Sequence, residues 1–321
     1  MHSFSEFASQ FSSYFQRDHF PAAPQTLYDP ARYFLELGGK RVRPVACLMG
    51  NELFDNVAED TWNVAVAIEL FHNFTLIHDD IMDRAPLRRN KETVHQKYGE
   101  STALLAGDVM LVATYEYLNK VSHNTSRQII GLFNKTAREV CEGQQLDMDF
   151  EKSSTVNFDD YLHMINLKTS VLLGASLQLG AVIGGAGERN QNLLYEFGRK
   201  LGLAFQVQDD YLDAFGDSEK FGKQVGGDIM ANKKTFLLIH ALETATEQHR
   251  SELQALLNTN TADKVHGVLK LFRACGVEAW AVELKDRYLQ EALQHLEDIA
   301  VVSKRKEPLK QLALFLTQRE H

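Results

Sequence analysis

Cysteine and proline are scarce in this sequence, with 3 Cys and 6 Pro among 321 residues. The cysteines, Cys47, Cys141 and Cys275, are odd in number and have no CxxC spacing, so the sequence offers no disulfide framework. Reduced thiols are typical of the cytoplasm, and we therefore expect a cytoplasmic protein.

Linker and strand signals are also missing. No Gly/Ser-rich or low-complexity tract divides the chain, and no alternating run of Val, Ile and Thr is flanked by Asn-Gly or Asp-Gly turns. Because 44% of the residues are hydrophobic, the chain can bury a sizeable core. We therefore predict one all-α domain that spans residues 1–321.

Long apolar runs and an excess of positive charge are absent as well. The longest uncharged stretch, residues 169–187, is interrupted by Ser, Gln and Gly, which is typical of a packed core helix and not of a membrane span. The N-terminus has Glu6 where a signal peptide would be basic. A net charge of −9 argues against a general nucleic-acid binder but allows an anionic substrate. We expect a soluble protein with no membrane insertion and no nucleic-acid partner.

The sequence does contain the pattern DDxxD twice, at residues 79–83 and 209–213. Each copy ends an apolar segment with helical periodicity, so the first and last carboxylates of each copy share a helix face. Carboxylates about 4 Å apart repel by about 1–4 kcal/mol, depending on the local dielectric, and a fold that gathered them would need cations. Mg²⁺ shared with substrate phosphates suits such ligands. Alternatively, the two motifs are solvated helix ends without a metal. The presence of two copies, each after an apolar helix, argues against this alternative.

Basic residues accompany these motifs. Residues 38–44 read Gly-Gly-Lys-Arg-Val-Arg-Pro, and residues 84–91 bring further cations directly after the first acidic motif. Such groups can hold a diphosphate, although a solvated basic turn is the alternative. Residues 221–234 combine Gly with Lys but lack the GxxxxGK[ST] pattern, so we predict a lid over an anionic substrate and not a nucleotide loop.

The segment between the two acidic motifs is expected to be helical. One of its helices should open near Phe158 and include Lys168, which heads a long apolar run. A lone Lys in such a place is usually a surface residue with its charged end in water, but turned inward it would hold a phosphate oxygen. The C-terminal third has helical periodicity without a chemical cluster, and we interpret it as scaffold.

Together these motifs resemble the trans-isoprenyl diphosphate synthases, the family of farnesyl and geranylgeranyl diphosphate synthases. The resemblance rests on GGKRVRP, LIHDDIMD, LRR, GQxxD, KT, FQxQDDYLD and GKxxGGDI followed by NKK, in the family's order over more than half the chain. It implies the isoprenoid synthase type I fold, a helical bundle around a deep central cavity, and a homodimer. The implied activity is that of a short-chain prenyltransferase, which condenses isopentenyl diphosphate with an allylic prenyl diphosphate through Mg²⁺-assisted ionisation, with about three Mg²⁺ ions per active site.

The resemblance assigns roles residue by residue. The positions that match metal ligands are Asp79, Asp83 and Asp209, with Asp80 and Asp213 in supporting positions. The positions that match the isopentenyl diphosphate site are Lys40, Arg43, His72 and Arg89. The positions that match the allylic diphosphate site are Arg88, Lys168, Lys223 and Lys233. Matching supporting polar positions are Gln144, Asp147, Thr169 and Gln206.

Product length should depend on the helix that ends in the first acidic motif. Phe74 lies five residues before Asp79, about 7.5 Å down the helix axis, and Phe71 lies about 12 Å down it. Thr75 is small, and a single aromatic at the position of Phe74 resembles geranylgeranyl-type synthases. We therefore favour geranylgeranyl over farnesyl diphosphate as the product, although Phe71 would shorten the product if it closed the cavity. Ordinary core packing is the alternative role for both rings.

Other classes of protein remain open at this point. A class I terpene cyclase also uses DDxxD and Mg²⁺, but it needs neither a second DDxxD nor a grip for a second diphosphate. A non-catalytic subunit of a two-component prenyl synthase usually lacks one acidic motif, whereas this chain has both. Catalysis is therefore the favoured interpretation.

Overall fold

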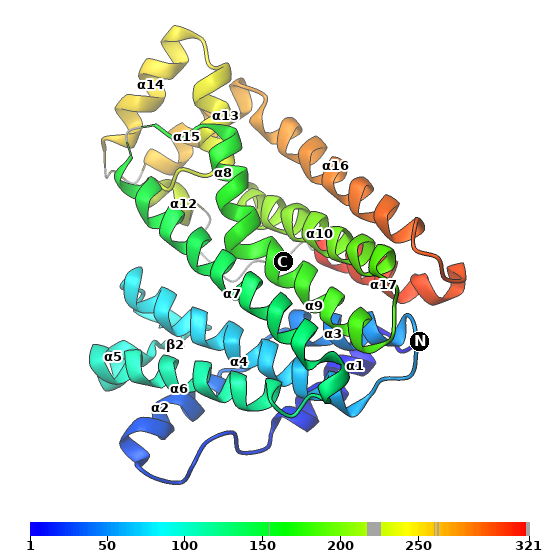
Figure 1. Cartoon of the computed structure of the whole chain (residues 1–321). Coiled ribbons are helices and arrows are strands. Elements are labelled where there is room, and N and C mark those ends of the chain that lie inside the picture. The colour runs from blue at the N-terminus through cyan, green and yellow to red at the C-terminus, as the bar shows by residue number, and fades with distance from the viewer. Residues whose placement is uncertain (154, 217–225, 260, 262, 319–321) are drawn as a thin grey trace. The chain divides into compact units, whose positions relative to one another are not determined.

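The computed structural model describes residues 1–153, 155–216, 226–259, 261 and 263–318. Within these ranges the chain is almost entirely helical (Figure 1), which confirms the prediction of an all-α fold. The strands described there are β1 (Leu87–Arg88) and β2 (Lys91–Glu92), a short antiparallel pair. None of the described helices combines the length and the apolarity that crossing a bilayer requires.

The chain forms two compact units. The first unit consists of Met1–Phe133 and Ser176–Asn192, and the second of Asn134–Ala175 and Leu193–His321. The expected single domain over the whole chain stays a prediction. The helices of the first part of the chain are α1 (Phe4–Phe15), α2 (Gln25–Glu36), α3 (Val42–Glu52), α4 (Glu59–Met82), α5 (Val94–Tyr98) and α6 (Glu100–Leu118).

The later helices complete the described chain. They are α7 (His123–Lys152), α8 (Phe158–Ile165), the π-helix η1 (Asn166–Ser170), α9 (Val171–Ile183), α10 (Glu188–Phe215), α12 (Gly227–Met230), α13 (Phe236–Thr244), α14 (Glu247–Leu257), α15 (Lys264–Ala274), α16 (Val277–Glu297) and α17 (Ser303–Thr317). A helix from Phe158 through Lys168 was expected, and the chain does continue helically there, but through one π turn at η1.

Helix α4 is buried along most of its length. Every residue from Asn63 to Phe71 is buried, and the helix packs against α3 and α6, since a helix that is apolar on all sides belongs in a core. Its acidic first turn suits the positive end of the helix dipole. Met82 and Asp83, at the other end, are exposed. The first acidic motif therefore stands at the surface end of a rigid, buried helix.

Helices α3 and α9 approach each other at their backbones within the first unit. A Cβ atom on Gly180 would clash with the carbonyl oxygen of Cys47, and one on Gly50 would clash with the carbonyl oxygen of Leu177. Glycine is required at both positions because no side chain fits between the helices.

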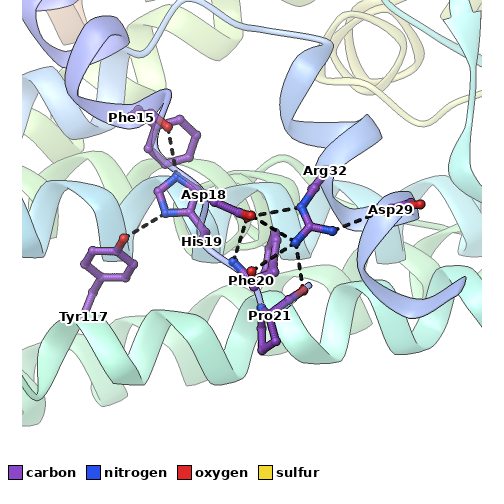
Figure 2. Close-up of polar contacts among 8 residues, drawn as sticks. All are labelled: Phe15, Asp18, His19, Phe20, Pro21, Asp29, Arg32 and Tyr117. Carbon is purple, nitrogen blue, oxygen red and sulfur yellow. Dashed lines mark hydrogen bonds and ion pairs between the residues drawn. The ribbon is translucent and has the colours of Figure 1, made fainter. Parts of the chain in front are cut away.

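The connection between α1 and α2 is held by polar contacts (Figure 2). The Arg32 guanidinium donates to both carboxylate oxygens of Asp18, at 3.1 and 3.2 Å, and to two carbonyl oxygens of the connection. The His19 ring lies 2.9 Å from the Phe15 carbonyl oxygen and 2.9 Å from the Tyr117 hydroxyl of α6. These contacts link the N-terminal helices to α6.

In the second unit, aromatic packing joins α8, α13 and α16. Trp280 of α16 stacks on the His240 ring at 3.7 Å and also contacts Phe158 of α8 and Phe236 of α13. Helix α12 packs on α15, and α17 packs on α16. The second acidic motif lies on α10, with Asp210 buried and Asp209 and Asp213 half-buried.

Candidate active site

The first acidic motif presents its carboxylates in two different ways. Asp80 is 1% exposed and is held by Arg88, whose Nε lies 2.9 and 2.8 Å from the two carboxylate oxygens and whose Nη2 lies 2.7 Å from Oδ1. Asp79 and Asp83 share the other helix face, and Asp83 is exposed at the C-cap of α4. Asp80 therefore orients Arg88, as its supporting position implies.

The three basic side chains of the GKRVRP loop, Lys40, Arg41 and Arg43, lie in different environments. Arg41 turns inward, where its guanidinium pairs with the buried carboxylate of Glu69 and lies 4.8 Å from the Phe15 ring. Asn73 donates to the same carboxylate at 3.0 Å. Arg41 also adopts a left-handed backbone with φ 53°, a conformation that costs free energy and that the buried ion pair holds in place. Lys40 is exposed at this turn.

Arg43 lies against His72 of α4. Its Nη1 donates to the imidazole Nε2 at 3.2 Å. Burial lowers the pKa of His72 well below its ordinary value, and the positive charges of Arg43, Arg89, Arg88 and Arg41 lower it further. The imidazole is therefore neutral near pH 7 and accepts the hydrogen bond. Arg41 is paired with Glu69 and Arg88 with Asp80, and the positive charge of Arg43 and Arg89 beside the neutral ring favours a bound anion.

Arg88 and Arg89 are presented by a hairpin that the sequence analysis missed. Leu87 pairs with Glu92, and Arg88 with Lys91, so Arg89 and Asn90 form the two-residue turn. Both turn residues have positive φ, at 52° and 62°, as a type I′ turn requires. Desolvation lowers the pKa of Arg89, and repulsion from Arg88 and Arg41 acts in the same direction. The hairpin places these cations in one cluster with Arg43 and His72.

In the second unit, Asp210 of the second motif is turned inward. Its oxygens accept hydrogen bonds from the Tyr161 hydroxyl at 2.8 Å and from Gln206 Nε2 at 2.9 Å. Burial raises the pKa of Asp210 to about 7, and the nearby charge of Asp228 adds to the rise. Asp213 accepts the Asp228 backbone N–H at 3.0 Å, so it anchors the start of α12.

Lys168 lies on the π-helix η1 and faces inward. Its ammonium is 2.5 Å from an Asp147 oxygen of α7. The helices approach closely because residue 143 of α7 is Gly, where a Cβ would clash with the Lys168 backbone nitrogen. A π turn is frequent at functional sites. The adjacent Thr169 hydroxyl donates to Gln206 at 3.4 Å, which extends the polar group to Asp210.

Of the remaining residues assigned by resemblance, Gln144 and Lys233 lie in the same unit. Gln144 is half-buried on α7, and Lys233 is exposed after α12, with its ammonium 4.0 Å from Asp228. Lys223 lies outside the described residues. Sequence reasoning assigned no role to Tyr161, Glu69 or Asp228. Only Asp228 carried a signal, since it belongs to the GGDI motif that follows the second DDxxD.

The carboxylates of each unit can bind Mg²⁺ only if a substrate or water supplies the remaining oxygen ligands. Among the described residues, no group of three or more His, Cys, Asp and Glu side chains is arranged to hold a metal ion. Asp79 with Asp83, and Asp209 with Asp213, offer hard carboxylate oxygens at four-residue spacing, to which water and phosphate oxygens would have to be added. This is the binding mode in which Mg²⁺ shares its coordination with a phosphorylated substrate.

An all-α fold with two such acidic motifs and separate cation clusters is characteristic of the isoprenoid synthases. The polyprenyl synthetase family model matches residues 24–274. Geranylgeranyl diphosphate synthase of Methanosarcina mazei is 37% identical over 303 residues, which cover 93% of this chain and 91% of that protein. The chain belongs to the polyprenyl synthetase family and is a short-chain trans-prenyltransferase.

Solved structures agree with this assignment. A crystal structure of geranylgeranyl pyrophosphate synthase superposes with a TM-score of 0.95 at 42% identity and covers 100% of both chains. The geranylgeranyl pyrophosphate synthetase of Pyrococcus horikoshii superposes with a TM-score of 0.93 at 34% identity, with 98% of each chain covered. The resemblance inferred from the motifs is thereby confirmed at the level of the family and the fold.

Proposed function

We propose that this prenyltransferase condenses isopentenyl diphosphate with allylic prenyl diphosphates, from dimethylallyl to farnesyl, and that its main product is geranylgeranyl diphosphate. The contact of Arg43 with a neutral His72 among further guanidinium groups carries the proposal. A reaction that joins two diphosphate esters needs two cation clusters. We assign Arg43 and Arg89 of the first unit to isopentenyl diphosphate, and Lys168 and Lys233 of the second unit to the allylic diphosphate. A terpene cyclase needs only one.

We assign Mg²⁺ binding to Asp79, Asp83 and Asp209, with about three ions per active site, the rest of each coordination sphere being water and diphosphate oxygens. Mg²⁺ held by these residues would neutralise the charge of the allylic diphosphate, which would make the diphosphate a better leaving group. The two acidic motifs support this assignment because each keeps two carboxylates at four-residue spacing and turns a third one inward.

The side chains around the metal ligands bind and orient the substrates. Arg88, oriented by Asp80, and Lys168, oriented by Asp147, bind the allylic diphosphate together with Lys223 and Lys233. Thr169 and Gln206 support Lys168. Lys40, Arg43, His72 and Arg89 bind isopentenyl diphosphate, which fixes its double bond near the allylic carbon. No described side chain is assigned as general base, and the departing diphosphate accepts the proton released at the end.

Packing around Phe74 supports a geranylgeranyl product. Phe71 is 1% exposed and packs edge-on against Phe133 at 5.2 Å, as a core residue does. Phe74 is half-buried, and its ring lies 4.7 Å from the His78 ring. Thr75 bonds to the His72 carbonyl oxygen at 2.8 Å and leaves no bulk beside Phe74. Phe74 is therefore the residue that we propose ends the chain-length cavity, with Phe71 behind it.

We also propose a homodimer in the cytoplasm. Helix α6 exposes Leu104, Leu105, Val112 and Tyr115, by 41, 54, 60 and 38%, an apolar face that a second copy would cover. No disulfide joins Cys47, Cys141 and Cys275, three cysteines of the described residues, which suits a reducing compartment. Sedimentation equilibrium tests the homodimer. A mass near 36.3 kDa, that of one chain, at micromolar concentration would exclude it.

The experiment that tests the proposal compares the two substrates in one variant. Arg43→Gln removes a guanidinium from His72 and should raise KM for isopentenyl diphosphate about tenfold or more, because charge-assisted hydrogen bonds are strong. KM for the allylic substrate should stay near the wild-type value. Arg127→Gln, on the exposed surface of α7, is the matched control. An equal rise in both KM values would contradict the assignment of Arg43.

A further inference from the structure

Lys264 is a buried lysine outside every motif considered so far. It is the first residue of α15 and is 0% exposed. Its ammonium donates to Asn232 Oδ1 at 2.7 Å and to the Met230 carbonyl oxygen at 3.3 Å. No carboxylate of the described residues pairs with it. Because a buried ammonium is strongly unfavourable without partners, these two oxygens are needed to satisfy it.

Both oxygens belong to the segment that carries Lys233. Met230 ends α12, and Asn232 has a left-handed backbone with φ 54°. The Asn232 N–H donates to the Ile229 carbonyl oxygen at 3.1 Å, and the Lys233 N–H to the Asp228 carbonyl oxygen at 2.9 Å. Lys264 therefore holds the side chain of Asn232. The strained backbone of Asn232 in turn sets the direction in which the chain continues from α12 to Lys233.

The other end of α12 is held as well. The Asp213 carboxylate of the second acidic motif accepts the Asp228 N–H at 3.0 Å, and its carbonyl oxygen accepts the Gly226 N–H at 2.6 Å. Val265, directly after Lys264, fills the space beside Gly226, where a Cβ would lie 2.5 Å from its Cγ1. Helix α12 is thus fixed between the second acidic motif and the start of α15.

We propose that Lys264 is a positioning residue for Lys233: it locks the turn at Asn232 so that the Lys233 ammonium is presented to the allylic diphosphate. This inference rests on the proposed function, in which Lys233 binds that diphosphate. The Lys233 side chain is 46% exposed and its ammonium lies 4.0 Å from Asp228, so its charged end is accessible to a ligand while α12 holds its backbone. Preorganising a ligand-binding side chain in this way removes part of the entropic cost of binding.

Kinetics of Lys264→Met test the proposal. Methionine keeps the length and most of the volume of the side chain but removes the ammonium. KM for the allylic diphosphate should rise about tenfold, as expected when a charge-assisted hydrogen bond is lost, while KM for isopentenyl diphosphate stays near the wild-type value. Asn232→Ala should reproduce this split, and the double variant should show no further rise because both changes break one contact.

Lys306→Met is the matched control. Lys306 is the other lysine buried among the described residues, at 4% exposure, and it donates to the Glu297 carbonyl oxygen at 2.5 Å. Its loss should lower thermal stability without changing either KM. If Lys264→Met behaves like Lys306→Met, or raises both KM values equally, Lys264 is only structural and the proposal is overturned.

Hydrogen exchange separates this outcome from a failure of the proposed function. In Lys264→Met, and not in Lys306→Met, the amides of residues 228–235 should exchange faster than in the wild type. If the wild-type chain condenses no substrate, the proposed function fails. Unchanged exchange would overturn the positioning role whether or not the chain is active.

Discussion

At the scale of single residues, the second carboxylate of each DDxxD motif is turned into the protein. Arg88 holds Asp80 through three contacts of 2.7–2.9 Å, and Tyr161 with Gln206 holds Asp210 at 2.8 and 2.9 Å. A carboxylate that is buried and hydrogen-bonded positions its neighbours better than it binds a metal. Of the outer carboxylates, those of Asp79, Asp83 and Asp209 are the ligands that we propose for Mg²⁺.

Replacement of one outer carboxylate tests this division. Asp79→Ala should lower kcat about a thousandfold, since a metal bound at the leaving group supplies several kcal/mol of transition-state stabilisation. The thermal unfolding midpoint should stay near that of the wild type. Asp286→Ala, whose side chain is 58% exposed on α16, serves as the control in the same steady-state assay. Turnover near the wild-type rate would show that Asp79 binds no essential metal.

The relative placement of the carboxylates within each motif could be predicted from the sequence. Their hydrogen-bond partners could not. Helical periodicity places Asp79 near Asp83 without any knowledge of the fold. The partner of Asp210 is different, because Tyr161 is 49 residues away along the chain. Contacts between residues so far apart in the chain depend on how the helices pack. The local patterns from which helices are predicted do not reveal them.

At the scale of elements, α4 joins the proposed chemistry to product length. The helix is buried from Asn63 to Phe71, and both Phe74 and the first acidic motif lie on its last turns. A side chain on this helix therefore has a fixed distance from the reacting centre, at about 1.5 Å per residue.

Phe74→Ala should lengthen the product. Removing the ring opens space below the first acidic motif, and Phe71 becomes the next aromatic at about one helical turn. Mass spectrometry of the products formed from farnesyl diphosphate should show chains beyond geranylgeranyl. Phe315→Ala, on the exposed face of α17, should leave the products unchanged. An unchanged distribution for Phe74→Ala would place the end of the cavity elsewhere.

Two elements were not predicted, for different reasons. The hairpin of β1 and β2 turns through Arg89-Asn90, whereas the usual signal is Asn-Gly or Asp-Gly. The two turn residues have φ values of 52° and 62° although neither of them is glycine. The π turn at η1 has no sequence signature, and it arises where α7 meets Lys168 at Gly143. The long helices were predicted because their periodicity is local.

At the scale of the whole molecule, the first unit has an acid-sensitive contact between its N-terminal helices and α6. His19 lies between the Phe15 carbonyl oxygen and the Tyr117 hydroxyl (Figure 2). Burial is the main cause that lowers the pKa of His19 from 6.5 to about 4. The fold therefore favours the neutral ring, and this contribution to stability is complete above pH 6.5 and is lost as the pH falls through 4.

The pH dependence of unfolding tests this contact. From pH 7 to pH 4, protonation of His19 should lower the free energy of unfolding by up to about 3 kcal/mol. Because the ring is not fully buried, solvent screening makes the decrease smaller than this upper value. His19→Gln does not titrate and should have a shallower pH dependence in urea unfolding. His123→Gln, at the exposed start of α7, controls for the loss of a histidine outside this contact. Parallel curves for His19→Gln and the wild type would contradict the lowered pKa.

The most direct test of the account is incubation of the purified protein with Mg²⁺, isopentenyl diphosphate and one allylic primer at a time, with the products sized by mass spectrometry. The account predicts condensation that stops when Mg²⁺ is chelated, with geranylgeranyl diphosphate as the main product from dimethylallyl, geranyl and farnesyl primers. A product that stops at farnesyl diphosphate would contradict the proposal that Phe74 ends the chain-length cavity. No condensation with any primer would contradict the central claim.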